Sequence, residues 1–354
     1  MAIITDYNQV KEIYAGAAER RWVIPCFCTE NLTTSEAVLS AAQEFAEANG
    51  HMKIPVTLAI TVQYRQRPQA CNYTHTRRWD LGLKLFRADA EALAGPGSPF
   101  PNVDLLLHLD HVQHDLDAEL LGRDLSGYSS IMYDASALPL DENIAKTAAF
   151  VDARRSKILI EGACDEIFDA GGNVHNPLTT PENAARYLNG TGADLLVANL
   201  GTEHRAVSQV ARYYDDAARK IKERIGPKIV LHGLSSASLD QVRNLYRDGV
   251  CKVNIWTMLE RDSAPALLRS MVENASKIAG RDVVDGLIGR GYLGYSVYGD
   301  AAAASAASPA ASAASSTSTV ATPSISHFTT MWRQDIIFNE MKKIVYEFFN
   351  MWYV

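Results

Sequence analysis

The sequence contains no uninterrupted apolar run that approaches the roughly 20 residues a helix needs to span a lipid bilayer. Its polar start, MAIITDYNQVKEIY, lacks the cationic segment followed by an apolar segment that marks a secretory signal peptide. Basic residues form no block, and a net charge of -7 gives a nucleic-acid or anionic-membrane surface no electrostatic support. We therefore expect a cytoplasmic protein without nucleic-acid or membrane partners.

Cysteine is scarce and odd in number, since the 354 residues include five, at positions 26, 28, 71, 164 and 251. An odd, scattered set argues against a disulfide framework and favours reduced thiols in or near a core. Cys26 and Cys28 would share one face of a strand with no third ligand. We expect them to pack rather than to act in redox chemistry.

Short apolar or β-branched runs alternate with longer amphipathic stretches from residue 20 to about residue 280. The eight expected strands are Trp22–Phe27, Ile54–Thr61, Val103–Leu109, Ser129–Met132, Ile158–Glu161, Leu195–Asn199, Lys228–Leu231 and Cys251–Ile255. Most are nearly continuous apolar runs, which is typical of parallel strands covered on both faces.

Helical patterns lie between the strands, at Ser35–Ala48, Leu140–Arg154, Pro181–Leu188 and Ser238–Asp248. The third has a threonine at its N-cap and stops before Gly190, and the fourth stops at Gly249. Eight such alternations in about 260 residues favour an α/β fold of the (β/α)8 TIM-barrel type. An open doubly wound sheet is the alternative.

The chain divides by composition into three parts, which we interpret as a barrel catalytic domain (1–298), an Ala/Ser-rich flexible linker (299–327) and a C-terminal helix (328–354). Apolar residues recur along this last segment at helical spacing, and charged residues among them exclude a membrane span. We expect an amphipathic helix that packs on the barrel or on a partner subunit.

Ionisable side chains gather where the expected strands end, and barrel active sites lie at the C-terminal ends of strands. The set comprises His108, Asp110 and His111 on the third strand, Asp134 on the fourth, Glu161 on the fifth, His204 on the sixth, His232 on the seventh and Asn254 on the eighth. Structural histidines have no reason to share one end of several strands. The pattern therefore predicts a metal site.

Three imidazoles, from His111, His204 and His232, would leave open positions for water or substrate, as in a catalytic zinc site. Asp110, next to a ligand, is the natural proton-transfer group. Glu161 and Asp134 would form a second cation site or orient the ligands. Such a set suits enolate formation or metal-assisted hydrolysis, but the first strand lacks the HxH pair of hydrolytic barrels.

The motifs HLDH (108–111), SSIMYDAS (129–136), LTTPENAARYLNGTGADLLVANLGTEH (178–204), LHG (231–233) and VNIWT (253–257) occur in this order. Over roughly residues 10–280 the chain resembles the class II, metal-dependent ketose-bisphosphate aldolases. The resemblance implies that zinc on the three histidines polarises the ketone of dihydroxyacetone phosphate and that Asp110 transfers a proton. It places Glu161 and Asp134 at auxiliary cation or supporting positions, and implies a sugar substrate and a homodimer or dimer of dimers.

Departures from the family pattern cluster where the family binds phosphate. HGGSG reads here as HGLSS, and NIDT reads as NIWT with Trp256. Substrate-binding candidates are Gly233, Ser235, Asn254, Thr257, Arg205, Cys28 (where the family has an asparagine) and Thr61. The loop acid is Asp169, with Asp165 and Glu166 as close rivals, and Arg65 and Arg67 are further anion-binding candidates.

These observations predict a zinc-dependent aldolase, with a possible second divalent or monovalent cation, that cleaves a ketose phosphate or a related acidic ketose. One alternative is a catalytically silent barrel that serves as a binding or assembly subunit. Others are an aldolase for unphosphorylated substrates and a metal-assisted lyase or epimerase that shares the enolate step.

Overall fold

The structure is a computed structural model that describes residues 3–50, 53–167, 177–203, 213–299 and 322–353. Its residues form two compact units, the first made of residues 1–260 with 342–354 and the second of residues 261–341. The first unit contains every strand described below. The second contains most of α10 (Thr257–Glu273), then α11 (Ala275–Ile278), α12 (Arg281–Gly289), η2 (Tyr295–Tyr298), α14 (Ile325–Phe328) and the start of α15 (Thr330–Trp352).

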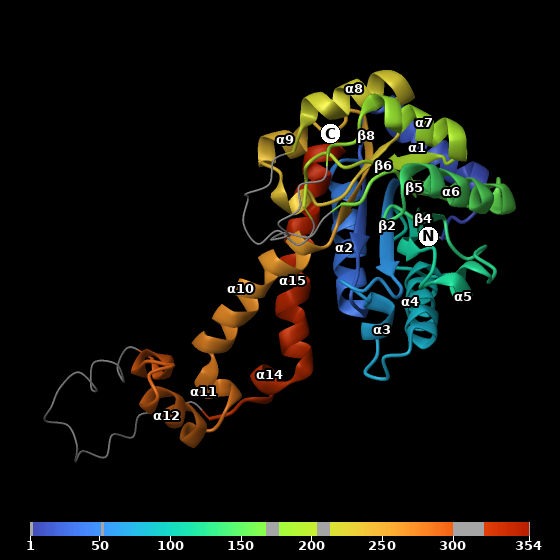
Figure 1. The fold of residues 1–354 in the computed structure, drawn as a ribbon. Coiled ribbons are helices and arrows are strands. Elements are labelled where there is room, and N and C mark those ends of the chain that lie inside the picture. The colour runs from blue at the N-terminus through green and yellow to red at the C-terminus, as the bar shows by residue number, and fades with distance from the viewer. Residues whose placement is uncertain (1–2, 51–52, 168–176, 204–212, 300–321, 354) are drawn as a thin grey trace, which may run out of the picture. The chain divides into compact units, whose positions relative to one another are not determined.

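Eight parallel strands close into a barrel in chain order, with the first strand paired to the last (Figure 1). They are β1 (Ile24–Cys28), β2 (Ile54–Thr61), β3 (Val103–Gln113), β4 (Ser130–Asp134), β5 (Leu159–Ala163), β6 (Leu195–Val197), β7 (Ile229–Leu231) and β8 (Val250–Ile255). Both faces of these strands are buried, which explains their continuous apolar sequences. The predicted (β/α)8 barrel is confirmed, and the open sheet is excluded.

Helices surround the barrel in the first unit (Figure 1). They are α1 (Tyr7–Glu19), α2 (Leu32–Ala48), α3 (Gln69–Asn72), α4 (Trp79–Ala94), α5 (Ala118–Leu121), α6 (Leu140–Arg154), α7 (Pro181–Thr191), α8 (Asp215–Ile225), the 3-10 turn η1 (Leu234–Ser236) and α9 (Leu239–Arg243). The Thr180 side chain caps α7 by accepting a bond from Asn183 N. This helix passes the predicted stop and ends at Gly192, whose φ of 70° is left-handed.

The helix predicted over Ser238–Asp248 is too long, because α9 ends at Arg243. Packing explains the early end. Leu245 is fully buried, and the Tyr246 hydroxyl donates to the carbonyl of Ala18, so the chain turns to place both side chains. Tertiary contacts here outweigh a helical sequence pattern.

The last turns of α15 pack on the barrel unit through aromatic side chains. Tyr353 stacks on Trp22 with ring centroids 4.5 Å apart, and Phe348 lies 6.1 Å from Phe27. The Trp352 indole donates to the carbonyl of Val242 at 2.8 Å. No helix among the described residues is long and apolar enough to cross a membrane. Residues 300–321 of the expected linker lie outside the described residues, so the three-part division of the chain stays a prediction.

Candidate active site

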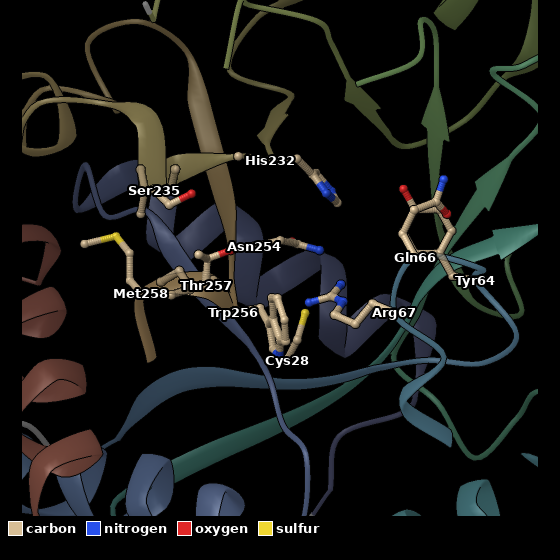
Figure 2. A pocket seen from close by; sticks show the side chains of 13 residues that line it. Cys28, Tyr64, Gln66, Arg67, His232, Ser235, Asn254, Trp256, Thr257 and Met258 are labelled. Atoms are coloured by element: carbon tan, nitrogen blue, oxygen red, sulfur yellow. The ribbon is translucent and has the colours of Figure 1, made fainter. Parts of the chain in front are cut away.

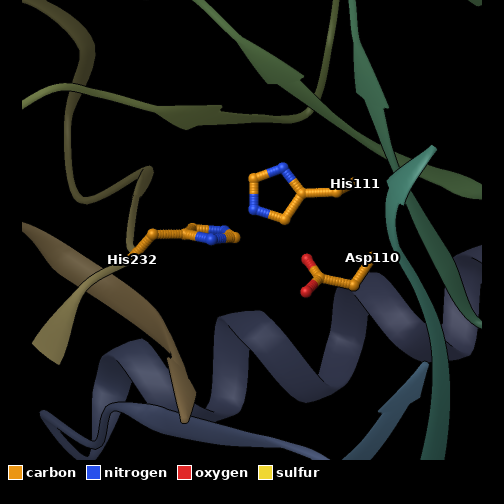
Figure 3. Close-up of side chains that lie close together, drawn as sticks. All are labelled: Asp110, His111 and His232. Carbon is orange, nitrogen blue, oxygen red and sulfur yellow. The ribbon is translucent and has the colours of Figure 1, made fainter. Parts of the chain in front are cut away.

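A β-bulge in β3 brings two adjacent side chains to one centre. Strict alternation would point Asp110 and His111 to opposite faces of the strand. The register with β4 shifts between Leu109 and Val112, and His111 has a left-handed φ of 46°. As a result, ligand atoms of Asp110, His111 and His232 all lie within 4.8 Å of one another (Figure 3).

His111 is held in orientation by neighbours on both sides. Its Nδ1 lies 3.0 Å from Asp134 Oδ2, which also accepts a hydrogen bond from the side-chain amide of Gln113 at 2.7 Å. The ring stacks on Tyr64 with centroids 4.4 Å apart. Burial tends to raise the pKa of Asp134, but its bonds to His111 and Ser136 outweigh this and lower the pKa to about 2. This carboxylate–histidine pair is typical of metal-ligating histidines.

His232 follows β7 and is fixed by its backbone. Its carbonyl accepts a bond from the Thr202 hydroxyl at 2.7 Å. Gly233 has a φ of 69°, and a Cβ there would lie 2.8 Å from the backbone of Glu203, so only glycine fits. The rings of His111 and His232 meet edge to face, with centroids 4.9 Å apart. Two imidazoles so close together, with a carboxylate beside them, fit the binding of a divalent transition metal by the imidazoles. The third expected ligand, His204, lies outside the described residues.

Asp110 is fully buried and is the acceptor for three donors from different elements. Arg67 Nη2 lies 2.6 Å from its Oδ2, Asn254 Nδ2 donates to Oδ1 at 2.8 Å, and the Cys28 thiol donates to Oδ2 at 3.4 Å. Burial tends to raise the pKa of Asp110, but the charges of His111, His232 and Arg67 outweigh this, and the pKa lies well below its usual value. Burial raises the pKa of Cys28 to about 12, so the thiol keeps its proton.

A second layer of ionisable side chains lies deeper in the barrel. Lys252 Nζ is 2.7 Å from Glu161 Oε1, and both side chains are fully buried. His108 Nε2 lies 3.7 Å from Glu161 Oε2, and its Nδ1 contacts the Ser130 hydroxyl at 2.8 Å. Glu161 does not end its strand as expected, because β5 continues to Ala163. Its carboxylate faces the Lys252 ammonium.

A pocket opens beside this centre, with His232 and Arg67 in its wall (Figure 2). It is lined by Cys28, Tyr64, Gln66, Arg67, His232, Gly233, Leu234, Ser235, Asn254, Ile255, Trp256, Thr257 and Met258. Five of the substrate-binding candidates are in this wall. Thr61 is not; its hydroxyl donates to the carbonyl of Arg67 and anchors the loop after β2.

A second pocket is lined by His111 and includes Arg65, Asp134, Asp165 and Glu166. Of the three candidate loop acids, Asp165 and Glu166 therefore lie in the same pocket as His111. Asp165 accepts a bond from the Thr179 hydroxyl at 2.6 Å. Asp169 and Arg205 lie outside the described residues.

Several contacts of this site were missing from the sequence interpretation. These are the Arg67–Asp110 ion pair, the Tyr64–His111 stack, the Gln113 bond to Asp134 and the Lys252–Glu161 ion pair. Lys252 could have been noticed in the sequence, because it is a lone cation within an apolar strand. Trp256 lines the pocket, carries the Arg67 guanidinium 5.2 Å from its ring centroid and donates to Glu30 at 2.6 Å.

Known proteins of this architecture include several aldolases. The fructose-bisphosphate aldolase from Campylobacter jejuni has a TM-score of 0.70 at 18% identity, covering 99% of this chain and 96% of that one. The YdjI aldolase from Escherichia coli K12 has a TM-score of 0.60 at 18% identity, covering 97% and 95%. A putative fructose-1,6-bisphosphate aldolase from Coccidioides immitis has a TM-score of 0.63 at 20% identity, covering 96% of this chain and 94% of that one.

Independently of these likenesses in fold, residues 8–289 match the sequence family described as fructose-bisphosphate aldolase class-II. With most of its length matched, and with the histidine–aspartate cluster at the barrel mouth, the chain belongs to the class II fructose-bisphosphate aldolase family.

Proposed function

We propose that this protein is a zinc-dependent lyase that reversibly cleaves a ketose phosphate, or a related acidic ketose, by a retro-aldol reaction. The products are dihydroxyacetone phosphate, or an analogue of it, and an aldehyde. The observation that supports this best is the buried Asp110 carboxylate within 4.8 Å of the ligand atoms of His111 and His232.

His111 and His232, together with His204, would hold the zinc ion. Bound there, zinc supplies a Lewis acid that polarises the ketone of the substrate. Asp134 holds the His111 ring through Nδ1 and fixes its tautomer, while Thr202 and Gly233 fix the backbone of His232. These contacts set the positions of the metal ligands before substrate binds.

Asp110 moves the proton. Since its pKa lies well below the usual value, the group is a carboxylate at neutral pH and accepts the proton of the aldehyde-derived hydroxyl as the C–C bond breaks. In the direction of synthesis it returns the same proton. Asn254 and Arg67 fix the orientation of the carboxylate, because each donates to one of its oxygens.

We expect a cytoplasmic homodimer or dimer of dimers, with a second divalent or monovalent cation beside the first site. Glu161, with a lysine at 2.7 Å, is poorly suited to that second cation, whereas Asp134 contacts a metal ligand directly.

Retro-aldol turnover on a ketose panel, with and without a chelator, tests the proposal. The panel holds bisphosphates, monophosphates, and unphosphorylated and carboxylated ketoses. Chelator-sensitive cleavage of one member supports the aldolase and identifies its substrate class. Bound zinc without cleavage of any member favours the silent barrel, for which the replacement of the family asparagine by Cys28 is the specific argument.

A further inference from the structure

The guanidinium of Arg67 is a fixed cation at the edge of the active-site pocket. The Arg67 amide donates to the carbonyl of Tyr64 at 2.9 Å, and the Arg67 carbonyl accepts from the Thr61 hydroxyl. Its side chain lies over the Trp256 ring and against Asp110. With backbone and side chain both held, Arg67 loses little freedom when it binds a ligand.

Part of this side chain faces the pocket. The contact with Asp110 uses one terminal nitrogen of a group that has five N–H donors. The Arg67 side chain remains 12% exposed, whereas Asp110 is fully buried. Because Arg67 lines the pocket beside Gly233 and Ser235, its exposed edge is available to a substrate group there (Figure 2).

The charged donors of the pocket are few. Among the described residues that line it, Arg67 is the one side chain of permanent positive charge, and it already contacts Asp110. A phosphate group has three terminal oxygens that need donors, more than one partly used guanidinium supplies. A carboxylate has two oxygens, and their planar arrangement matches the guanidinium fork.

The neighbouring turn gives a phosphate little additional support. Leu234 fills the position after Gly233 and is 2% exposed. The Ser236 hydroxyl donates to the carbonyl of Gly233 at 2.8 Å and accepts a bond from Glu203 N, so it is used within the turn. The side chains of Leu234 and Ser236 therefore serve packing and turn geometry, and Ser235 is the hydroxyl of this turn that lines the pocket.

We infer that Arg67 is a specificity-determining residue that binds a carboxylate group of the substrate, so that the acidic ketose is a sugar acid rather than a sugar phosphate. The inference rests on the proposed aldolase function and names its substrate class. It also assigns Asp110 a second role, as the anion that holds the Arg67 guanidinium in place while its exposed edge binds the substrate.

Binding to a variant with strongly slowed turnover tests the assignment. D110N removes both the proton-transfer group and the charge that balances Arg67, so affinities can be measured by calorimetry while cleavage is slow. The probes share the fructose skeleton: D-fructose, 2-keto-D-gluconate with a carboxylate at C1, D-fructuronate with a carboxylate at C6, fructose 1-phosphate and fructose 6-phosphate. All are measured on zinc-loaded protein.

We expect D110N to bind one carboxylated probe more tightly than D-fructose and more tightly than either phosphate. Adding R67Q should weaken that binding by about 10- to 100-fold, as expected for one charged hydrogen-bonded contact. Adding R123Q, which removes an exposed arginine that lines neither pocket, should leave it unchanged.

Three results would overturn the assignment: equal affinity for D-fructose and both carboxylated probes, unchanged carboxylate affinity after R67Q, or tightest binding of a phosphate that depends on Arg67. Zinc content and turnover are measured separately on the wild type. Their absence contradicts the aldolase proposal, whereas the comparison of D110N with D110N/R67Q alone decides the role of Arg67.

Discussion

Asp134 Oδ2 lies 3.0 Å from His111 Nδ1, and this contact between the ends of β4 and β3 turns the other ring nitrogen toward His232 (Figure 3). The carboxylate is buried and also accepts bonds from Gln113 and Ser136. It is therefore rigid enough to fix the tautomer and the orientation of the imidazole. A metal ligand supported in this way is oriented before the metal arrives.

D134N should weaken zinc binding by about 10- to 100-fold, because an amide holds the ring less firmly and lowers its basicity. The measurement is a competition titration with a chromophoric chelator. D115N, which alters an exposed carboxylate in the same pocket, is the matched control and should bind zinc as the wild type does. Equal zinc affinity of D134N and the wild type would show that Asp134 does not support a metal ligand.

G233A should both destabilise the fold and weaken zinc binding. The added Cβ meets the backbone of Glu203 at 2.8 Å and displaces His232, so we expect a cost of about 2 kcal/mol or more in the free energy of unfolding. G192A is the control, since Gly192 has nearly the same φ of 70° but its Cβ would meet nothing nearer than 3.7 Å.

Denaturant unfolding and zinc titration of the two glycine variants separate the backbone strain of a residue at positive φ from the displacement of His232. G192A should lose about 1 kcal/mol and keep its zinc affinity. If the two variants lose equal stability and both keep zinc, then Gly233 is required only for its backbone angle.

K252M should lower the free energy of unfolding by about 3–5 kcal/mol, because it leaves the Glu161 carboxylate buried without its cation. K252M/E161M removes both charges and should recover most of that loss. Guanidinium chloride unfolding of the two variants checks this. A double variant as unstable as K252M would mean that the ion pair has a further role in the barrel.

Glu260 should make the protein less stable as the pH rises. Burial, assisted by the charge of Glu30, raises its pKa to about 7, above the ordinary value of 4.5. The folded protein thus keeps the Glu260 proton up to a pH of about 7, whereas the unfolded chain releases it near pH 4.5. Up to about 3 kcal/mol in the free energy of unfolding is therefore lost between pH 4.5 and pH 8.

E260Q removes this titration, so it should match the wild type at pH 5 and exceed its melting temperature by several degrees at pH 8.5. E223Q, which changes an exposed carboxylate on α8, should match the wild type at both values. If E260Q shows no advantage at pH 8.5, the carboxylate is ionised in the folded protein at neutral pH.

The barrel could be predicted because its strands are buried on both faces and therefore have continuous apolar sequences. Ile54–Thr61 and Leu140–Arg154 agree with the structure at both ends. Gly192, not Gly190, ends α7, because only the left-handed backbone of the C-cap requires glycine. The excess length of the predicted α9 reflects tertiary contacts of Leu245 and Tyr246, which a local pattern does not contain.

The site could be predicted in its residue types but not in its contacts. Asp110 and His111 were assigned to one centre from their motif, although alternation alone would separate them; the bulge and the left-handed His111 resolve this. The pairing of Asp110 with Arg67 joins β3 to a loop 43 residues earlier, and no periodicity encodes that distance. Only three-dimensional packing reveals which arginine of the loop turns inward.

The most direct test of the aldolase account is the turnover and zinc content of D110N measured beside the wild type on the same ketose. The account predicts about one zinc per chain in both proteins, since three histidines are the ligands. It also predicts a fall in the rate of cleavage by about 10²- to 10⁴-fold in D110N, because the proton-transfer group is lost. A wild type without zinc, or a D110N variant that cleaves at the wild-type rate, would contradict it.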